Sequence, residues 1–249
     1  MRGLYEKDLF GLKKMLYSIV LISAIVFLIS ILAILSMRYG NLLLARQTIG
    51  EKEFRMIFRL ETIFPLLIPI AFMGEVNSCF ASDEKAGFWK LVKSMPVSPG
   101  QIVLSRYLTL FTMAGIGLTV SFLGALVIGG FSDILKLGEL LVFPFILCCV
   151  LLSGISLGMP IAYRFGSKTN IVVMVVVVIG ALAGFEAYAL LHTMNMSDAE
   201  TEAFIEAVLN KGSVLLHSGR MGLLLFLITV VCVLISFGIS VETVKRKKG

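Results

Sequence analysis

Residues 17–36, YSIVLISAIVFLISILAILS, form a run of twenty amino acids without a single charged side chain. A helix rises about 1.5 Å per residue, so this run is long enough to cross about 30 Å of hydrocarbon. Strands that cross a membrane alternate apolar and polar residues, whereas this run is continuously apolar. The run therefore predicts a membrane-spanning helix.

The rest of the 249-residue chain repeats this pattern. Hydrophobic residues make up 58% of the sequence and charged residues only 15%, whereas a soluble domain carries about 25% charged residues. Apolar runs predict six spans, at residues 17–36, 62–80, 103–129, 137–163, 171–191 and 221–241. We therefore expect an all-α integral membrane protein that forms one transmembrane domain over residues 1–249.

Two segments outside the spans are expected to fold against the membrane. Before the first span, Lys7 and Lys14 lie opposite an apolar helical face, which predicts a helix in the membrane interface; the face consists of Leu4, Tyr5, Leu9, Leu12 and Leu16. After the fifth span, residues 193–220 begin with a capping box, Ser197 with Glu200. This pattern predicts a folded segment at the outer end of the bundle.

Basic residues indicate the orientation in the membrane. Six spans place both termini on one side, and the segments on that side hold fourteen of the 22 Lys and Arg residues, which leaves eight on the other. Because cytoplasmic segments are enriched in Lys and Arg, we expect a multi-pass protein of a bacterial plasma membrane with both termini in the cytoplasm.

A charged amphipathic segment interrupts the apolar sequence at residues 83–95. Ser82 is a candidate N-cap, and Pro96 ends the predicted helix. One sector of this helix is apolar and the charged side chains lie away from it; the sector consists of Phe88, Leu91, Val92 and Met95. Such a helix suits either the membrane interface or a groove on a cytoplasmic partner.

The stretch DEKAGFWKLVKSMPVSPGQIVLSRYL, residues 83–108, resembles the segment between the second and third spans of small ABC-2-type transporter permeases. An acid–Lys–x–Gly opening, a Pro-Val-Ser turn and an Ile-Val-x-Ser-basic-aromatic ending carry the resemblance, at Glu84, Lys85, Gly87, Leu91, Pro96, Val97, Ser98, Ile102, Val103, Ser105, Arg106 and Tyr107. The opening GLYEKDLFGLKK is also similar to the start of those permeases.

The resemblance implies a function for the charged segment. In such transporters it is a coupling helix that docks into a separate ATP-binding subunit, and here the implied coupling residues are Glu84, Lys85, Phe88, Trp89, Leu91, Val92 and Met95. It also implies two permeases with two ATPases, which bind the ATP and Mg²⁺. The overall pattern is most similar to permeases that export phenol-soluble modulins or other antimicrobial peptides.

The sequence predicts no nucleotide site, no catalytic site, no metal site and no cofactor in this chain. RFGSKTN, residues 164–170, contains Gly-Ser-Lys-Thr but lacks the glycine before lysine and the earlier glycine of a phosphate loop. We interpret it as a short cytoplasmic turn and as a second, smaller contact for the ATPase. Energy for transport would then come from the partner.

Two acidic residues lie inside predicted spans. Glu75 falls near the cytoplasmic end of the second span and Glu186 in the outer part of the fifth. A charge at mid-membrane costs about 2.5–3.5 kcal/mol on insertion scales, so neither side chain is expected to face lipid. Both are candidates for lining a translocation path, and the alternative role is a hydrogen bond between helices.

Two other functions are compatible with the pattern. An ion-coupled secondary transporter would need ionisable residues near mid-bilayer and usually a repeat across the two halves, and neither is evident. A non-transporting scaffold that recruits a cytoplasmic partner would need only the amphipathic helices. A phosphate-loop ATPase encoded next to this chain would favour the exporter.

Overall fold

The computed structural model describes residues 2–39, 68–94, 96–131, 137–169, 172 and 219–248. Within these ranges the elements are helices, in the order α1 (Arg2–Tyr39), α4 (Ile68–Gly74), α5 (Val76–Lys85), α6 (Phe88–Ser94), α7 (Pro99–Phe131), α8 (Leu137–Phe165) and α11 (Gly219–Lys248). The expectation of an all-helical protein is confirmed for this part of the chain.

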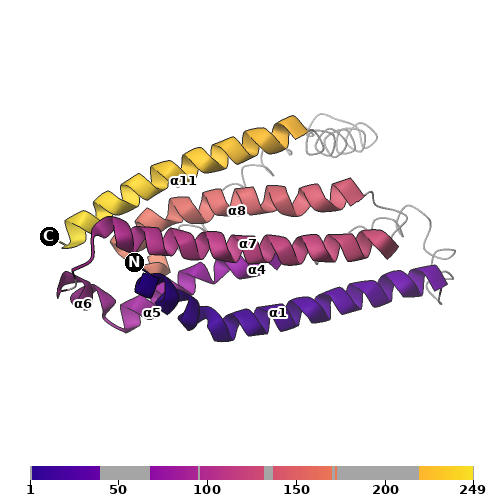
Figure 1. The fold of residues 1–249 in the computed structure, drawn as a ribbon, viewed down its shortest axis with the longest axis horizontal. Helices are drawn as coiled ribbons and strands as arrows, with labels where there is room; N and C mark the ends of the chain where they lie inside the picture. The colour runs from indigo at the N-terminus through magenta and orange to yellow at the C-terminus, as the bar shows by residue number, and fades with distance from the viewer. Residues whose placement is uncertain are drawn as a thin grey trace, which may run out of the picture.

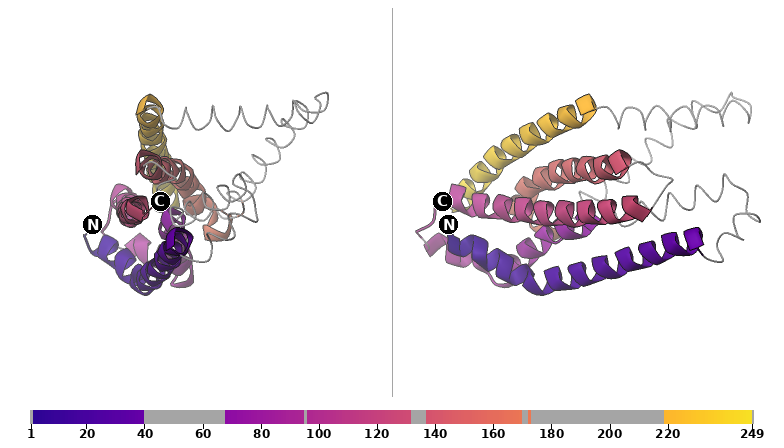
Figure 2. Two further views of the ribbon diagram at one scale, coloured as in Figure 1. Left: turned by 90° about the vertical axis from the view of Figure 1, so that its right-hand side faces the viewer. Right: turned by 45° about the vertical axis from the view of Figure 1, so that its right-hand side comes forward.

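The long helices α1, α7, α8 and α11 run alongside one another, and α5, α6 and both chain ends lie at one end of the bundle (Figure 1). We call this the terminal end. Helix α7 packs against α1, α4, α8 and α11, and Figure 2 shows these neighbours from two further directions. Helix α7 is therefore the element through which the others are connected.

Four helices in the described ranges are long and apolar enough to cross a membrane, over Arg2–Leu32, Pro99–Val127, Pro144–Phe165 and Gly222–Lys247. They correspond to the first, third, fourth and sixth predicted spans. The outward faces of α1 and α11 carry many large apolar side chains, as helices in lipid do. The second predicted span is described only from Ile68 onward, and the fifth, except Val172, lies outside the described residues, as does 193–218.

The N-terminal segment is helical, as predicted, and it forms the first turns of the same helix as the first span. Helix α1 is continuous over 38 residues, or about 57 Å, although its first turns are angled against the rest (Figures 1 and 2). The apolar face turns toward the protein: Leu12 is buried, and the Tyr5 hydroxyl lies 2.8 Å from the Thr112 hydroxyl of α7. No proline interrupts residues 2–39, so the helix continues directly into the span.

The charged segment differs from its prediction, because residues 83–95 do not form one helix. Helix α5 continues from Val76 through Ser82 to Lys85, and α6 begins at Phe88. Gly87 lies between them with φ +62°, and its amide bonds to the Glu84 carbonyl at 3.2 Å. A left-handed glycine ends a helix in this way. Ser82 is therefore not an N-cap.

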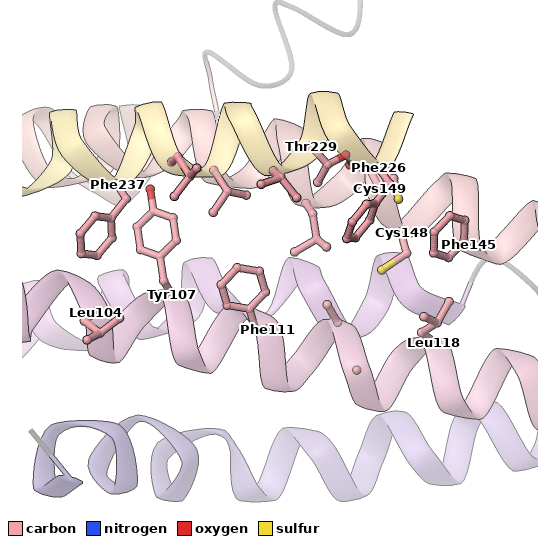
Figure 3. Close-up of a pocket in the computed structure, with 16 residues that line it drawn as sticks. Leu104, Tyr107, Phe111, Leu118, Phe145, Cys148, Cys149, Phe226, Thr229 and Phe237 are labelled. Atoms are coloured by element: carbon pink, nitrogen blue, oxygen red, sulfur yellow. Dashed lines mark hydrogen bonds between the residues drawn. The ribbon is translucent and has the colours of Figure 1, made fainter. Parts of the chain in front are cut away.

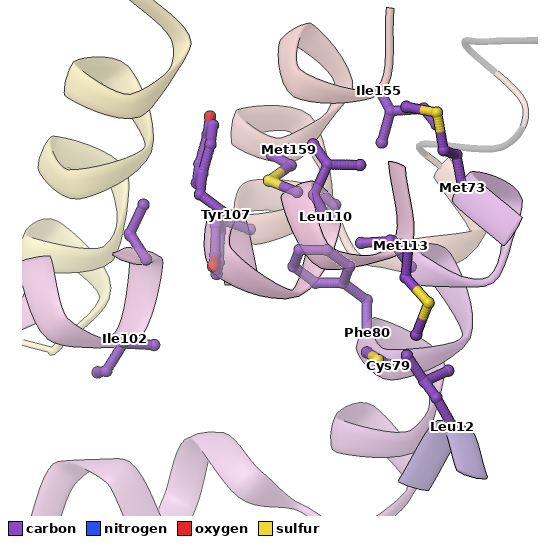
Figure 4. Packing of buried hydrophobic residues seen from close by; sticks show 14 of the residues in the cluster. Leu12, Met73, Cys79, Phe80, Ile102, Tyr107, Leu110, Met113, Ile155 and Met159 are labelled. Atoms are coloured by element: carbon purple, nitrogen blue, oxygen red, sulfur yellow. The ribbon is translucent and has the colours of Figure 1, made fainter. Parts of the chain in front are cut away.

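The hydrophobic core lies toward the terminal end of the bundle. Figure 4 shows part of it, where side chains of α1, α4, α5, α7 and α8 meet; the labelled residues are Leu12, Met73, Cys79, Phe80, Ile102, Tyr107, Leu110, Met113, Ile155 and Met159. Gly117 of α7 brings α4 especially close, because a Cβ there would lie 3.1 Å from the Pro69 Cα. The core thus fixes α5 and α6 relative to the long helices.

Candidate functional site

Four charged side chains from three helices meet beside α6. The Lys7 ammonium of α1 donates to Asp83 Oδ1 of α5 at 2.6 Å, and Arg106 of α7 donates from Nη2 to Asp83 Oδ2. Arg106 Nη1 also pairs with Asp8 Oδ1 of α1 at 3.1 Å. We call Lys7, Asp8, Asp83 and Arg106 the ionic cluster. It ties the ends of α1, α5 and α7 together.

Asp8, Asp83 and Arg106 are buried, Lys7 reaches the surface, and the formal charges of the four side chains balance. Asp8 and Arg106 are each only 4% exposed, and the two cations offset the two carboxylates. Arg106 Nη2 also donates to the Cys79 carbonyl at 3.3 Å. Taking charges out of water is costly unless each one is paired and hydrogen-bonded. The arrangement therefore holds the three helices in one relative position, since any shift would leave a buried charge without its partner.

The two faces of α6 have different surroundings. Phe88 is buried with its ring 3.9 Å from the Lys7 ammonium, and Val92 is buried in the same core. Trp89 stacks edge-on against Tyr163 of α8, and the Lys247 ammonium of α11 lies 4.5 Å from its ring. Leu91, in contrast, is 53% exposed. The face predicted to dock on a partner is thus divided: Phe88 and Val92 serve the protein's own core, whereas Leu91 is accessible.

Glu84 connects the charged segment to the turn after α8. Its Oε1 accepts a hydrogen bond from the Ser167 amide at 2.7 Å, and its Oε2 accepts one from the Ser167 hydroxyl at 3.0 Å. Gly166 precedes this serine with φ +96°, and a Cβ there would lie 2.5 Å from Glu84 Oε1. The RFGSKTN stretch, predicted as a turn and as a second contact for the ATPase, therefore receives the Glu84 carboxylate within the permease itself.

We expect Glu84→Ala to lower the free energy of unfolding by about 1–2 kcal/mol, because two hydrogen bonds to a charged group are lost. Glu6→Ala is the matched control. Glu6 pairs with Arg2 on the exposed surface of α1, and exposed pairs of this kind contribute about 0.5 kcal/mol or less. Thermal unfolding of the two purified variants in detergent measures the difference. Equal losses would show that the Glu84–Ser167 link contributes no more than a surface pair.

Of the remaining predicted site residues, two lie in the described ranges and two lie outside them. Glu75 lies in the turn between α4 and α5, half-buried, and its carbonyl accepts a bond from the Ser78 amide at 2.9 Å. Lys85 is exposed at the end of α5. Met95 and Glu186 lie outside the described residues. No group of His, Cys, Asp and Glu in the described ranges is arranged to hold a metal ion.

Sequence reasoning did not assign a role to Asp8, Ser167 or Lys247. The sequence alone offered one indication for Asp8. It is an acidic residue in a basic, amphipathic segment, and Lys7 is the only basic residue within one helical turn of it. Its second partner, Arg106, is 98 residues away, so only the fold shows the pairing.

An apolar groove with a volume of about 570 Å³ lies between α7, α8 and α11. Aromatic and aliphatic side chains from all three helices point into it (Figure 3), among them Phe111, Leu118, Phe145, Phe226 and Phe237. Few polar groups border it: the Tyr107 hydroxyl donates to Ser236 Oγ at 2.8 Å, and the Ser153 hydroxyl donates to Thr229 Oγ1 at 3.1 Å. The groove therefore suits apolar material.

A comparison with protein families identifies the family to which the chain belongs. The sequence model of a family described as ABC-2 family transporter protein matches residues 52–245, which include α4 to α8 and most of α11. No curated protein and no solved structure matches the chain. Since the matched range covers most of the 249 residues, this chain belongs to the ABC-2 transporter family and is a membrane-spanning permease of an ABC transporter.

Proposed function

We propose that this chain is the permease subunit of an ATP-driven exporter in a bacterial plasma membrane, with both termini in the cytoplasm. In this proposal a separate ATP-binding subunit docks against α6 and the end of α5, and it supplies the ATP, the Mg²⁺ and the hydrolysis. The coupling segment, residues 83–94, then passes the movement of the ATPase to the spans.

The observation that supports this proposal is the set of contacts made by the coupling segment. Asp83 pairs with Arg106 of α7 and with Lys7 of α1. Glu84 holds the turn that follows α8. Trp89 contacts Tyr163 of α8 and Lys247 of α11. The coupling segment as a whole thus has contacts with all four long helices, and in this proposal a displacement of the segment moves them together.

The exposed residues of the segment indicate the chemistry of the docking partner. Leu91 is an accessible apolar side chain, and the coupling segment also carries two exposed cations, Lys85 and Lys90. A partner that fits them has a small apolar pocket with acidic residues at its rim. The buried Phe88 and Val92 would support this surface from behind rather than enter the partner.

A paired-variant experiment tests the docking. We expect Lys90→Glu/Leu91→Asp to insert and to unfold at the wild-type temperature, because both side chains are exposed. The variant should nevertheless lose co-purification with the ATPase and lose stimulation of ATP hydrolysis, since truncating an interface anchor commonly costs about 2 kcal/mol or more.

The matched control is Phe10→Asp/Lys13→Glu. In this control an exposed apolar residue of α1 becomes aspartate and an exposed lysine becomes glutamate, at the same end of the bundle. The control should keep its ATPase. Wild-type association of the Lys90→Glu/Leu91→Asp variant would reject α6 as the docking site.

For the cargo, we propose amphipathic or antimicrobial peptides, moved by two permease copies that act with two ATPases. The similarity of the overall sequence pattern to peptide-exporting permeases supports this class of substrate. The apolar groove between α7, α8 and α11 is compatible with the apolar face of such a peptide. In the same proposal Glu75 and Glu186 line the translocation path.

A further inference from the structure

A second hollow of about 670 Å³ lies at the terminal end, between the ends of α8 and α11. Its lining comes from one turn of α8 and three turns of α11, namely Arg164, Gly238, Ile239, Glu242, Thr243, Arg246 and Lys247. We call it the basic pocket. None of these residues belongs to the coupling segment or to the ionic cluster.

The basic pocket carries an excess of positive charge. Three cations and one carboxylate line it, which leaves a net charge of +2. Glu242 pairs with Arg246 at 3.2 Å, while Arg164 stacks over the Phe165 ring at 5.1 Å. Among the described residues, no ion pair joins Arg164 to a carboxylate of this chain. The pocket is thus electrostatically complementary to an anion.

The position of the pocket along α11 is informative. The large apolar side chains exposed on this helix end at Ile239, after Leu234 and Ile235, and charged residues follow from Glu242 to Lys248. The exposed Phe165 marks the same level on α8. The basic pocket therefore lies where the lipid-facing band meets the polar end, which is the depth of the phospholipid headgroups.

We propose that the basic pocket binds the phosphate of an anionic phospholipid, with Arg164, Arg246 and Lys247 around the headgroup and the acyl chains along Val231, Ile235 and Ile239, which are exposed on the same face of α11. Basic pockets between membrane helices bind such headgroups. A free phosphate ion shares the chemistry of the headgroup, but the apolar stripe below the pocket favours the lipid. The proposal depends on the position of the membrane surface and not on an ATPase or on the cargo.

Binding can be followed through Trp89, because it is the only tryptophan in the chain and Lys247 of the pocket lies 4.5 Å from its ring. The full-length protein in neutral detergent is titrated with dioctanoyl phosphatidylglycerol while tryptophan fluorescence is recorded, and native mass spectrometry counts the bound lipid. Dioctanoyl phosphatidylcholine and inorganic phosphate are titrated in parallel. We expect saturable binding of phosphatidylglycerol alone.

Arg164→Gln/Arg246→Gln should weaken phosphatidylglycerol binding about twenty-fivefold, at about fivefold for each cation removed, whereas Arg164→Lys/Arg246→Lys should largely preserve it. The control Lys13→Gln/Lys14→Gln removes the same charge from exposed positions of α1 and should change binding less than about twofold.

Four results would overturn the proposal. Inorganic phosphate that binds as tightly as phosphatidylglycerol would identify an ion site, and equal binding of phosphatidylcholine would remove the role of the charge. An equal loss in the α1 control would indicate a general effect of net charge. Unchanged lipid binding by Arg164→Gln/Arg246→Gln, together with loss of the ATPase, would assign the pocket to an acidic surface of that partner.

Discussion

Replacing Arg106 by methionine should lower the free energy of unfolding by about 3–5 kcal/mol, because the change leaves two buried carboxylates without their main cation. Arg106 pairs with both Asp8 and Asp83 and also bonds to the Cys79 carbonyl. The loss should therefore weaken the attachment of α7 both to α5 and to α1. Denaturant-induced unfolding of the purified protein in detergent micelles measures it.

Two further variants separate the buried charges from the volume of the side chain. Arg246→Met removes an arginine from an exposed pair with Glu242 and should cost about 0.5 kcal/mol or less. Adding Asp8→Asn and Asp83→Asn to Arg106→Met should restore part of the stability, since no uncompensated buried charge remains. If Arg106→Met costs no more than Arg246→Met, the ionic cluster does not hold the helices together.

Replacing Phe88 by alanine should cost about 3 kcal/mol of stability, as expected for a large side chain removed from a core. Phe88 is only 8% exposed and lies under the Lys7 ammonium. The sequence predicted a docking anchor here, and such an anchor would be accessible in the isolated permease. The structure instead predicts that this variant unfolds more easily even when no ATPase is present.

Leu91→Ala is the matched control for Phe88→Ala because it shortens an exposed apolar side chain on the same helix. It should change the melting temperature of the isolated permease little, as surface substitutions usually do. If both variants melt at the wild-type temperature, Phe88 is not part of the permease core and the sequence-based view of α6 is restored.

The spans were the part of the fold that the sequence predicted best. Four of the six predicted spans correspond to long apolar helices in the described residues, because twenty apolar residues have few alternatives to a membrane helix. The bounds were less accurate: α11 ends at Lys248, whereas the prediction ended at residue 241. Helical hydrogen bonding continues past the apolar run, and the pair between Glu242 and Arg246 supports the extra turns.

The charged segment shows why the candidate site was only partly predictable. Periodicity identified an apolar sector, but it did not show that Phe88 faces the protein while Leu91 faces outward. That distinction depends on Gly87, whose positive φ ends α5 and sets the direction in which α6 begins. The partners of Asp83 and Glu84 are Lys7, Arg106 and Ser167, which are distant in sequence. A single sequence carries no signal for such pairings.

We propose above that the exposed face of α6 contacts a cytoplasmic ATP-binding subunit. Site-specific photocrosslinking tests it directly: a photoreactive amino acid replaces Leu91 in one strain and Leu227 in another, and the ATP-binding subunit proposed as the partner is co-expressed. Leu227 is the control because it is exposed on the apolar band of α11.

We expect a crosslink to the ATPase from position 91 and none from position 227. A permease that reaches the membrane intact but forms no crosslink from position 91, or that forms equal crosslinks from both positions, would contradict the proposal.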